Sequence, residues 1–151
     1  MKKIKVLLGA LAIAVTGLLG FLAPASANAA SSLPCGFNAE DWRNLSYLVT
    51  WTPPGQPGRS VDATFYVGGI TSITNDQGAI FPGTWDTNRY YPGLGRTAMR
   101  FGADGVDGLH VDHYVQSASC DDFGVSQFTA TRVVTLRSGS TVTYRTVGLR
   151  R

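Results

Sequence analysis

The sequence predicts an all-β domain, namely a single small antiparallel barrel of about seven to eight strands closed by one disulfide bond. Apolar and polar residues alternate with period two over several short runs, as in strands with one buried face. Clusters of Gly, Pro, Asn and Asp separate these runs and are typical of turns between strands. No sustained helical stripe of apolar residues with caps is present in the sequence. A β-sandwich is the alternative architecture, because short strands joined by hairpins build both.

Residues 1–29 have the three-part pattern of a bacterial-type secretory signal peptide. Three lysines precede a long apolar run, which ends in small residues with Ala at alternate positions. Cleavage after Ala27 and cleavage after Ala29 fit this pattern equally well. An uncleaved membrane anchor is the alternative, because the apolar run approaches the ~18 residues of a spanning helix. We therefore expect 30–151 to form one secreted, extracellular domain that retains no membrane span.

The net charge of the chain, +3, comes from this N-terminal segment. All three lysines lie within it, so the expected mature domain carries ten arginines against ten acidic residues. A net charge near zero gives no reason to expect nucleic acid or an anionic membrane as partner.

The two cysteines, Cys35 and Cys120, are expected to form a disulfide bond. Export places the chain in an oxidising compartment, where such bonds form and persist. The bridge would close a loop of about 85 residues and contribute ~4 kcal/mol in the chain-entropy model. Two separate buried thiols are the alternative.

The alternating runs define the expected strands and their connections. Strands are expected over residues 45–51, 61–67, 70–74, 79–81, 97–101, 109–116, 125–136 and 141–147. The Pro- and Gly-rich stretch 52–58 is expected to form a loop, and 137–140 a hairpin turn. A short turn of helix is expected over 38–45, with Asn38 as its cap and Trp42 facing inward.

The segment 81–96 is the main candidate for a binding site, because it is long for a hairpin loop and rich in aromatic and arginine side chains. The candidate binding residues are Trp85, Arg89, Tyr90, Tyr91 and Arg96. Aromatic rings offer stacking faces, and guanidinium groups donate directional hydrogen bonds. The alternative is that Trp85 and one tyrosine plug an end of the barrel.

A second candidate is the polar row on the expected strand 109–116. Period two places His110, Asp112 and Tyr114 on one face and His113 on the other, toward the core. His110 and Asp112 offer two metal ligands where a site needs three or four.

The Asp- and Gly-rich stretch 102–108 reads as a turn between strands. Its aspartates, Asp104 and Asp107, suggest calcium as an alternative together with Asp112, Asp121 and Asp122, but this group lacks the order of acidic positions of an EF-hand. Asp-Gly pairs are ordinary turn formers. We therefore expect neither a metal nor a cofactor.

Three function classes follow from these features. The first is a secreted binding module that holds a glycan, a small molecule or a protein with the aromatic and arginine-bearing loop or the barrel mouth. The second is a secreted inhibitor or antagonistic protein that acts through the same loop. The third is a small hydrolase that uses the His110 and Asp112 face, although no Gly-flanked nucleophile is present. The sequence favours binding over catalysis.

Overall fold

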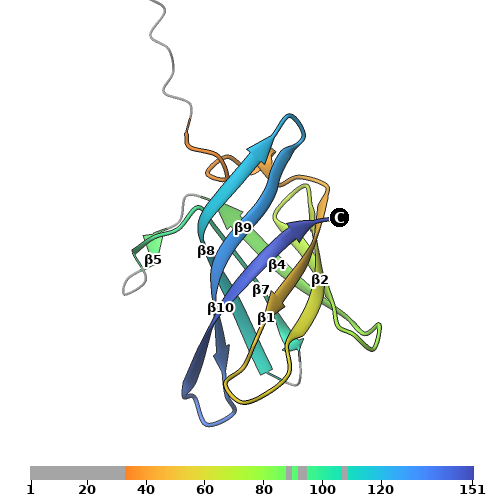
Figure 1. Cartoon of the computed structure of the whole chain (residues 1–151), viewed down its shortest axis with the longest axis vertical. Coiled ribbons are helices and arrows are strands. Elements are labelled where there is room, and N and C mark those ends of the chain that lie inside the picture. Colours follow the sequence, from red (N-terminus) through yellow and green to blue (C-terminus); the bar gives the residue numbers. More distant parts are fainter. Residues whose placement is uncertain (1–32, 88–89, 92–94, 107–108) are drawn as a thin grey trace, which may run out of the picture. The chain divides into compact units, whose positions relative to one another are not determined.

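The computed structural model describes residues 33–87, 90–91, 95–106 and 109–151, and the strands among them form a closed barrel (Figure 1). Eight strands, all paired antiparallel, close in the order β1-β10-β9-β8-β7-β4-β3-β2. The remaining two, β5 and β6, pair as a separate small sheet. The predicted antiparallel barrel is therefore confirmed over the sandwich. The predicted signal peptide, 1–29, lies outside the described residues.

Short connections join the elements along the chain. In chain order they are the 3₁₀ turn η1 (Ala39–Asp41) and the strands β1 (Leu45–Trp51), β2 (Arg59–Tyr66), β3 (Ile70–Thr74), β4 (Ile80–Thr87), β5 (Tyr90–Tyr91), β6 (Gly95–Arg96), β7 (Met99–Val106), β8 (Leu109–Asp121), β9 (Gly124–Thr135) and β10 (Thr141–Arg150). The expected strands at 45–51 and 70–74 have these bounds in the structure, and the expected turn over 137–140 joins β9 to β10.

Two strands run through residues that the sequence pattern assigned to turns. β4 continues through Pro82 to Thr87, and β7 continues through Gly102 toward Val106. Proline is tolerated here because β4 pairs with β7 only from Gly83 onward, so Pro82 has a neighbouring strand on one side alone. The expected bounds of these two strands were therefore too short.

Large aromatic side chains fill one end of the barrel. Trp42, Tyr47, Phe65, Phe101 and Phe128 are each at most 1% exposed. Their rings meet at tilted and edge-to-face angles, with centroids 5.0 Å apart for Phe65 and Phe101 and 5.2 Å apart for Tyr47 and Phe128. Such pairs contribute about 0.5–1.5 kcal/mol each beyond the burial of their surface. This cluster is the main apolar core of the barrel.

The segment before β1 closes the same end. The disulfide between Cys35 and Cys120, with Cα atoms 5.9 Å apart, ties this segment to β8 and confirms the predicted bridge. Trp42 faces inward as predicted, and its indole N–H donates to the carbonyl of Gly36 at 2.8 Å. The helical segment is shorter than expected, and Asn38 makes no side-chain cap bond. The carboxylate of Asp41 in η1 instead accepts a hydrogen bond from the Gly36 N–H at 2.9 Å.

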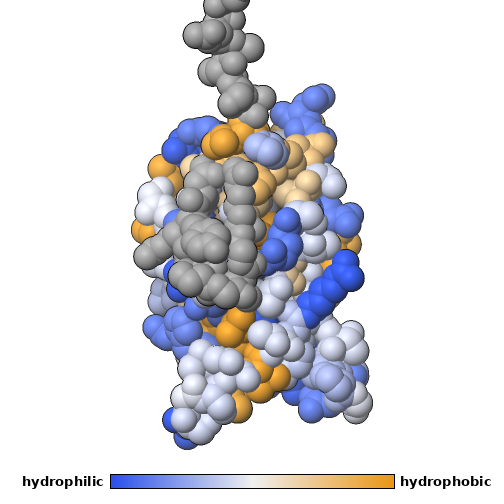
Figure 2. Space-filling model, turned by 90° about the vertical axis from the view of Figure 1, so that its left-hand side faces the viewer, coloured by the Kyte–Doolittle hydropathy of each residue, from blue (hydrophilic) through white to orange (hydrophobic). Residues whose placement is uncertain are grey.

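The opposite end of the barrel is open. The loop 52–58 and the turn between β9 and β10 lie at that end, away from η1 (Figure 1). In the space-filling view, apolar surface is visible there between two polar projections (Figure 2). The interior is therefore filled at one end and accessible at the other.

Loss of the disulfide is expected to destabilise the fold without changing it. The bridge closes 85 residues of chain, so a variant with both Cys35→Ser and Cys120→Ser should lose ~4 kcal/mol of unfolding free energy. Urea denaturation of the oxidised protein and of the double variant measures the difference. Superimposable unfolding curves would contradict this role of the bridge.

Candidate functional site

Trp85 lies in a strand and its ring is in the core. It belongs to β4 and is 5% exposed. The indole N–H donates to the Tyr66 carbonyl at 2.9 Å, and the ring packs against Phe65 with centroids 6.1 Å apart. This is the plug arrangement that the sequence left open, so the ring of Trp85 offers little surface to a ligand.

The other members of the aromatic and arginine-bearing segment are less fully described. Arg89 lies outside the described residues. Tyr90 and Tyr91 form β5 and pair through their backbone with β6, where Tyr90 is the partner of Arg96. Residues 81–87 of the segment thus belong to β4, and 90–91 pair with 95–96 in a separate two-stranded sheet. A binding role for these four side chains stays a prediction.

The polar row of β8 forms a hydrogen-bonded network on the outer surface of the barrel. His110 lies between two carboxylates, with its Nδ1 2.6 Å from Asp104 Oδ1 and its Nε2 3.1 Å from Asp112 Oδ2. Asp112 also pairs with Arg100, whose Nη2 lies 2.6 Å from Oδ1. Tyr114 donates its phenol proton to the same carboxylate at 3.4 Å. The three residues singled out in the sequence therefore lie together.

A glycine makes room for this network. Gly102 on β7 is the cross-strand partner of Asp112. A Cβ at this position would lie 2.3 Å from Asp112 Oδ1 and 2.5 Å from the carbonyl of Val111. The Asp112 carboxylate thus occupies the space that a side chain on β7 would need, and the strand continues where the sequence suggested a turn.

Both ring nitrogens of His110 are engaged, which determines its chemistry. The hydrogen bond to Asp104, and then that to Asp112, raise the pKa of the imidazole above its usual value. A general base needs a ring nitrogen that is available to accept a proton from substrate, and here each nitrogen faces a carboxylate. No feature of this geometry favours the hydrolase alternative, which stays a prediction.

His113 points into the barrel, as the period-two pattern predicts. Its ring stacks on Phe101 with centroids 4.3 Å apart and is fully buried. Burial, and then the guanidinium of Arg132, hold the pKa of His113 well below its usual value. Arg132 Nη1 lies 3.3 Å from Nε2, and a guanidinium only donates, so the neutral ring carries its proton on Nδ1.

The open end of the barrel contains a cavity of about 180 Å³, which we call the mouth. Its lining combines aliphatic groups with one large ring and a few polar side chains. The residues are Trp51, Pro53, Gln56, Arg59, Leu109, Arg132, Val134, Leu136, Val142 and Tyr144. Two guanidinium groups and no carboxylate are among these described lining residues.

Arg132 is the most unusual of the lining residues, because its side chain points inward from β9 and is 2% exposed. Its guanidinium carbon lies 3.9 Å from the centroid of the Trp51 ring, in a cation–π contact. With the hydrogen bond to His113, this contact fixes the position of the cation beside the cavity. A positive charge thus lies at a defined position beside a cavity whose lining is mostly apolar.

The sequence analysis names the barrel mouth as a binding place but identifies none of its residues, although one signal was available for Arg132. Arg132 alternates in phase with Phe128, Ala130 and Val134, so period two places it on the inward face of its strand. An arginine at an inward position of a barrel strand is rare unless it is paired or functional.

Comparisons with protein-family models, with curated proteins and with solved structures find no match for this chain. Within the described ranges, no helix is long and apolar enough to cross a membrane. Over the same residues, no group of three or more His, Cys, Asp or Glu side chains is placed to hold a metal ion.

The two histidines are expected to titrate in opposite directions from the usual value of about 6.5. The pKa of His110 should lie above this value, because two carboxylates favour its imidazolium form. The pKa of His113 should lie well below this value. Imidazole chemical shifts measured by NMR against pH give both midpoints, and His110→Gln assigns the signals. Midpoints in the reverse order would refute the two environments.

The pKa shifts of His110 and His113 also make the free energy of unfolding depend on pH. His110 contributes stability that is complete below the unfolded pKa of about 6.5 and is lost as pH rises through its folded pKa. His113 acts in the opposite sense, because below about pH 6.5 the unfolded chain takes up a proton that the folded chain does not. A His110→Gln variant should therefore approach the stability of the parent protein at high pH.

Proposed function

We propose that this protein is a secreted binding module whose barrel mouth holds a small anion with an apolar body. The observation that carries the proposal is the guanidinium of Arg132, buried and stacked on Trp51 at the side of the cavity. Small barrels commonly bind ligands at their mouths, in cavities that are mostly apolar with a few fixed polar groups. Secretion is part of the proposal and rests on the signal pattern of residues 1–29.

The size of the cavity limits the ligand. Its volume of about 180 Å³ is close to the roughly 150 Å³ of an engineered apolar cavity that takes up benzene. A ligand with a single ring or a short alkyl chain fits this space. Leu109, Leu136 and Val142 supply apolar surface for its body, and each buried methylene contributes about 0.8 kcal/mol.

The charge of the lining determines the sign of the ligand. Arg59 and Arg132 both line the mouth, and a guanidinium binds a carboxylate through charge-assisted hydrogen bonds, which contribute about 1.5–3 kcal/mol. Arg132 is already oriented by Trp51 and His113, so little side-chain entropy is lost when a ligand binds. A small aromatic or aliphatic carboxylate therefore matches both the shape and the charge of the mouth.

The proposal keeps the class that the sequence favours but moves the site. Binding by the segment 81–96, and an inhibitor that acts through it, stay predictions. The mouth lies at the opposite end of the barrel from the plug of aromatic rings, whereas Trp85 belongs to that plug.

Benzoate is the probe for this site. We expect it to raise the melting temperature of the exported protein in a saturable way, because it binds the folded state alone. The size-matched neutral benzyl alcohol and the cationic benzylamine should bind more weakly. Arg59→Gln should weaken the binding of benzoate by about three- to tenfold, because one of two cationic partners is lost. Isothermal titration calorimetry measures the affinities.

Arg137→Gln serves as the matched control, because Arg137 is an exposed arginine beside the β9–β10 turn that does not line the mouth. Its affinity for benzoate should equal that of the parent protein. Arg132→Met, which keeps the bulk of the side chain, should abolish the binding of benzoate. This variant is interpreted only if its far-ultraviolet circular dichroism spectrum matches that of the parent protein, which shows that it folds. Equal binding of benzoate and benzyl alcohol would refute a charge-selective mouth.

A further inference from the structure

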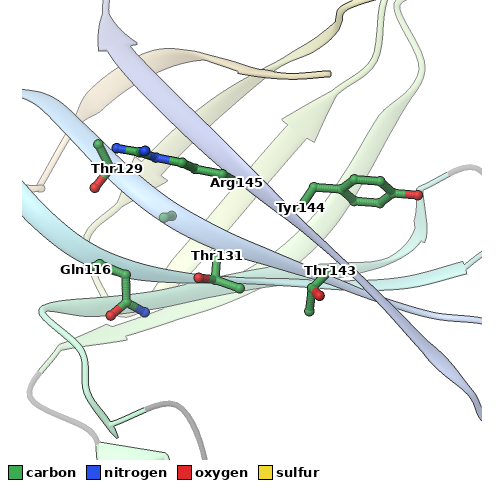
Figure 3. A pocket seen from close by; sticks show the side chains of 7 residues that line it. Gln116, Thr129, Thr131, Thr143, Tyr144 and Arg145 are labelled. Atoms are coloured by element: carbon green, nitrogen blue, oxygen red, sulfur yellow. The ribbon is translucent and has the colours of Figure 1, made fainter. Parts of the chain in front are cut away.

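A second hollow lies on the outer surface of the barrel, over β8, β9 and β10. It is an open depression of about 420 Å³. Figure 3 shows Gln116 from β8, Thr129 and Thr131 from β9, and Thr143 and Arg145 from β10 around it. These five side chains point outward, whereas the mouth lies inside the barrel, and Tyr144 is the one residue that lines both hollows. Nothing in the proposed function uses it.

The strand register explains how these side chains come together. Thr131 on β9 is the cross-strand partner of Tyr114 on one side and of Arg145 on the other. Residues that pair in this way point to the same face of a sheet. A phenol, a hydroxyl and a guanidinium thus lie in one row across three strands. Tyr114, identified in the sequence as part of a polar face, is the β8 member of this row.

A bulge positions the amide in the hollow. The register of β8 and β9 shifts between Val115 and Ser117, which leaves Gln116 as the extra residue. Its Nε2 donates to the carbonyl of Tyr114 at 3.1 Å, so the amide is oriented and its oxygen is left to accept. Bulges often turn a side chain toward a functional site.

The described residues that line the hollow carry one positive charge, that of Arg145. Arg145 is exposed and is the only charged residue among the described residues that line it. No acidic side chain pairs with Arg145 in the described part of the chain. The remaining polar groups, Thr131, Thr143 and Gln116, are uncharged and both donate and accept hydrogen bonds.

We propose that this hollow binds an acidic glycan, that is, a sugar chain that carries carboxylates. A sugar hydroxyl donates and accepts, as do the threonine hydroxyls and the glutamine amide that line the hollow. A uronate adds one carboxylate per ring, which matches one guanidinium among neutral groups. The volume is more than twice the roughly 150 Å³ that takes up a benzene ring, which suits a pyranose with its substituents.

The test uses trigalacturonate as the probe and maltotriose as its neutral counterpart. We expect saturable chemical-shift changes in NMR spectra of the exported protein at Gln116, Thr131 and Arg145 with trigalacturonate, and weaker binding of maltotriose. Arg145→Gln should lower the affinity for trigalacturonate about tenfold or more, because the charged partner is lost. Thr131→Val should lower it as well.

Two controls keep this test apart from that of the mouth. Ser72→Ala, on the outer face of β3 across the barrel, should leave the affinity for trigalacturonate unchanged. Arg59→Gln should weaken benzoate and spare trigalacturonate, whereas Arg145→Gln should do the reverse. All of these variants change surface side chains, and an unchanged melting temperature verifies that they fold.

Three results would overturn the proposal. They are the absence of saturable binding of trigalacturonate, equal affinity for maltotriose, and chemical-shift changes confined to the mouth around Trp51. If trigalacturonate does not bind, the proposal for the hollow is refuted, but the proposal for the mouth is not. If benzoate does not bind, the proposal for the mouth is refuted, but the proposal for the hollow is not.

Discussion

The structure depends on how a closed barrel fills its interior. Eight strands enclose a space that side chains can fill or that can hold one small ligand, and in this chain the largest rings gather at one end. Trp42, Tyr47, Phe65 and Phe128 are essentially inaccessible to solvent there. Gly148 shows how tightly they pack, because a Cβ at this position would lie 2.1 Å from the Phe128 ring. Burial of each ring contributes about 1.5–3 kcal/mol, so this end holds the fold together.

That concentration of volume leaves the other end available for polar groups. The buried core also contains small residues, Ala63, Ala103 and Ala130, and the side chain of Arg132 is buried with them. A buried cation costs free energy unless it is partnered. Stacking on Trp51 and the hydrogen bond to His113 offset part of that cost. The mouth is therefore a consequence of the same packing that closes the opposite end.

Polar groups outside the barrel follow a different rule. The carboxylate of Asp112 lies over Gly102 and pairs with the side chains of Arg100 and His110. Arg145, in contrast, has no acidic partner among the described residues. The first set is a closed network in which charges compensate one another. The second is an open arrangement that a ligand can complete. A ligand carboxylate could therefore pair with Arg145, whereas the charges around His110 already have partners.

Much of the fold could be predicted because it follows from local pattern. Period-two alternation places His113 inward and His110 outward, and a chain with two cysteines allows only one pairing. The extension of β4 through Pro82 could not be predicted, since it depends on which side of the strand has a neighbour.

The residues that line the mouth could not be predicted from the sequence alone. Trp51, Arg59, Arg132 and Tyr144 come from β1, β2, β9 and β10, and closure of the barrel brings them together. Nothing in their spacing along the chain indicates that they share a cavity.

The most direct test of a barrel filled at one end and open at the other is a map of where a small apolar anion enters. Titration of the isotope-labelled protein with benzoate, followed through the indole and methyl signals, gives that map. The packing described here predicts shifts at Trp51, Val134 and Leu136, and none at Trp42 or within the cluster of rings around it. Shifts centred on Trp42, or spread over both ends, would contradict it.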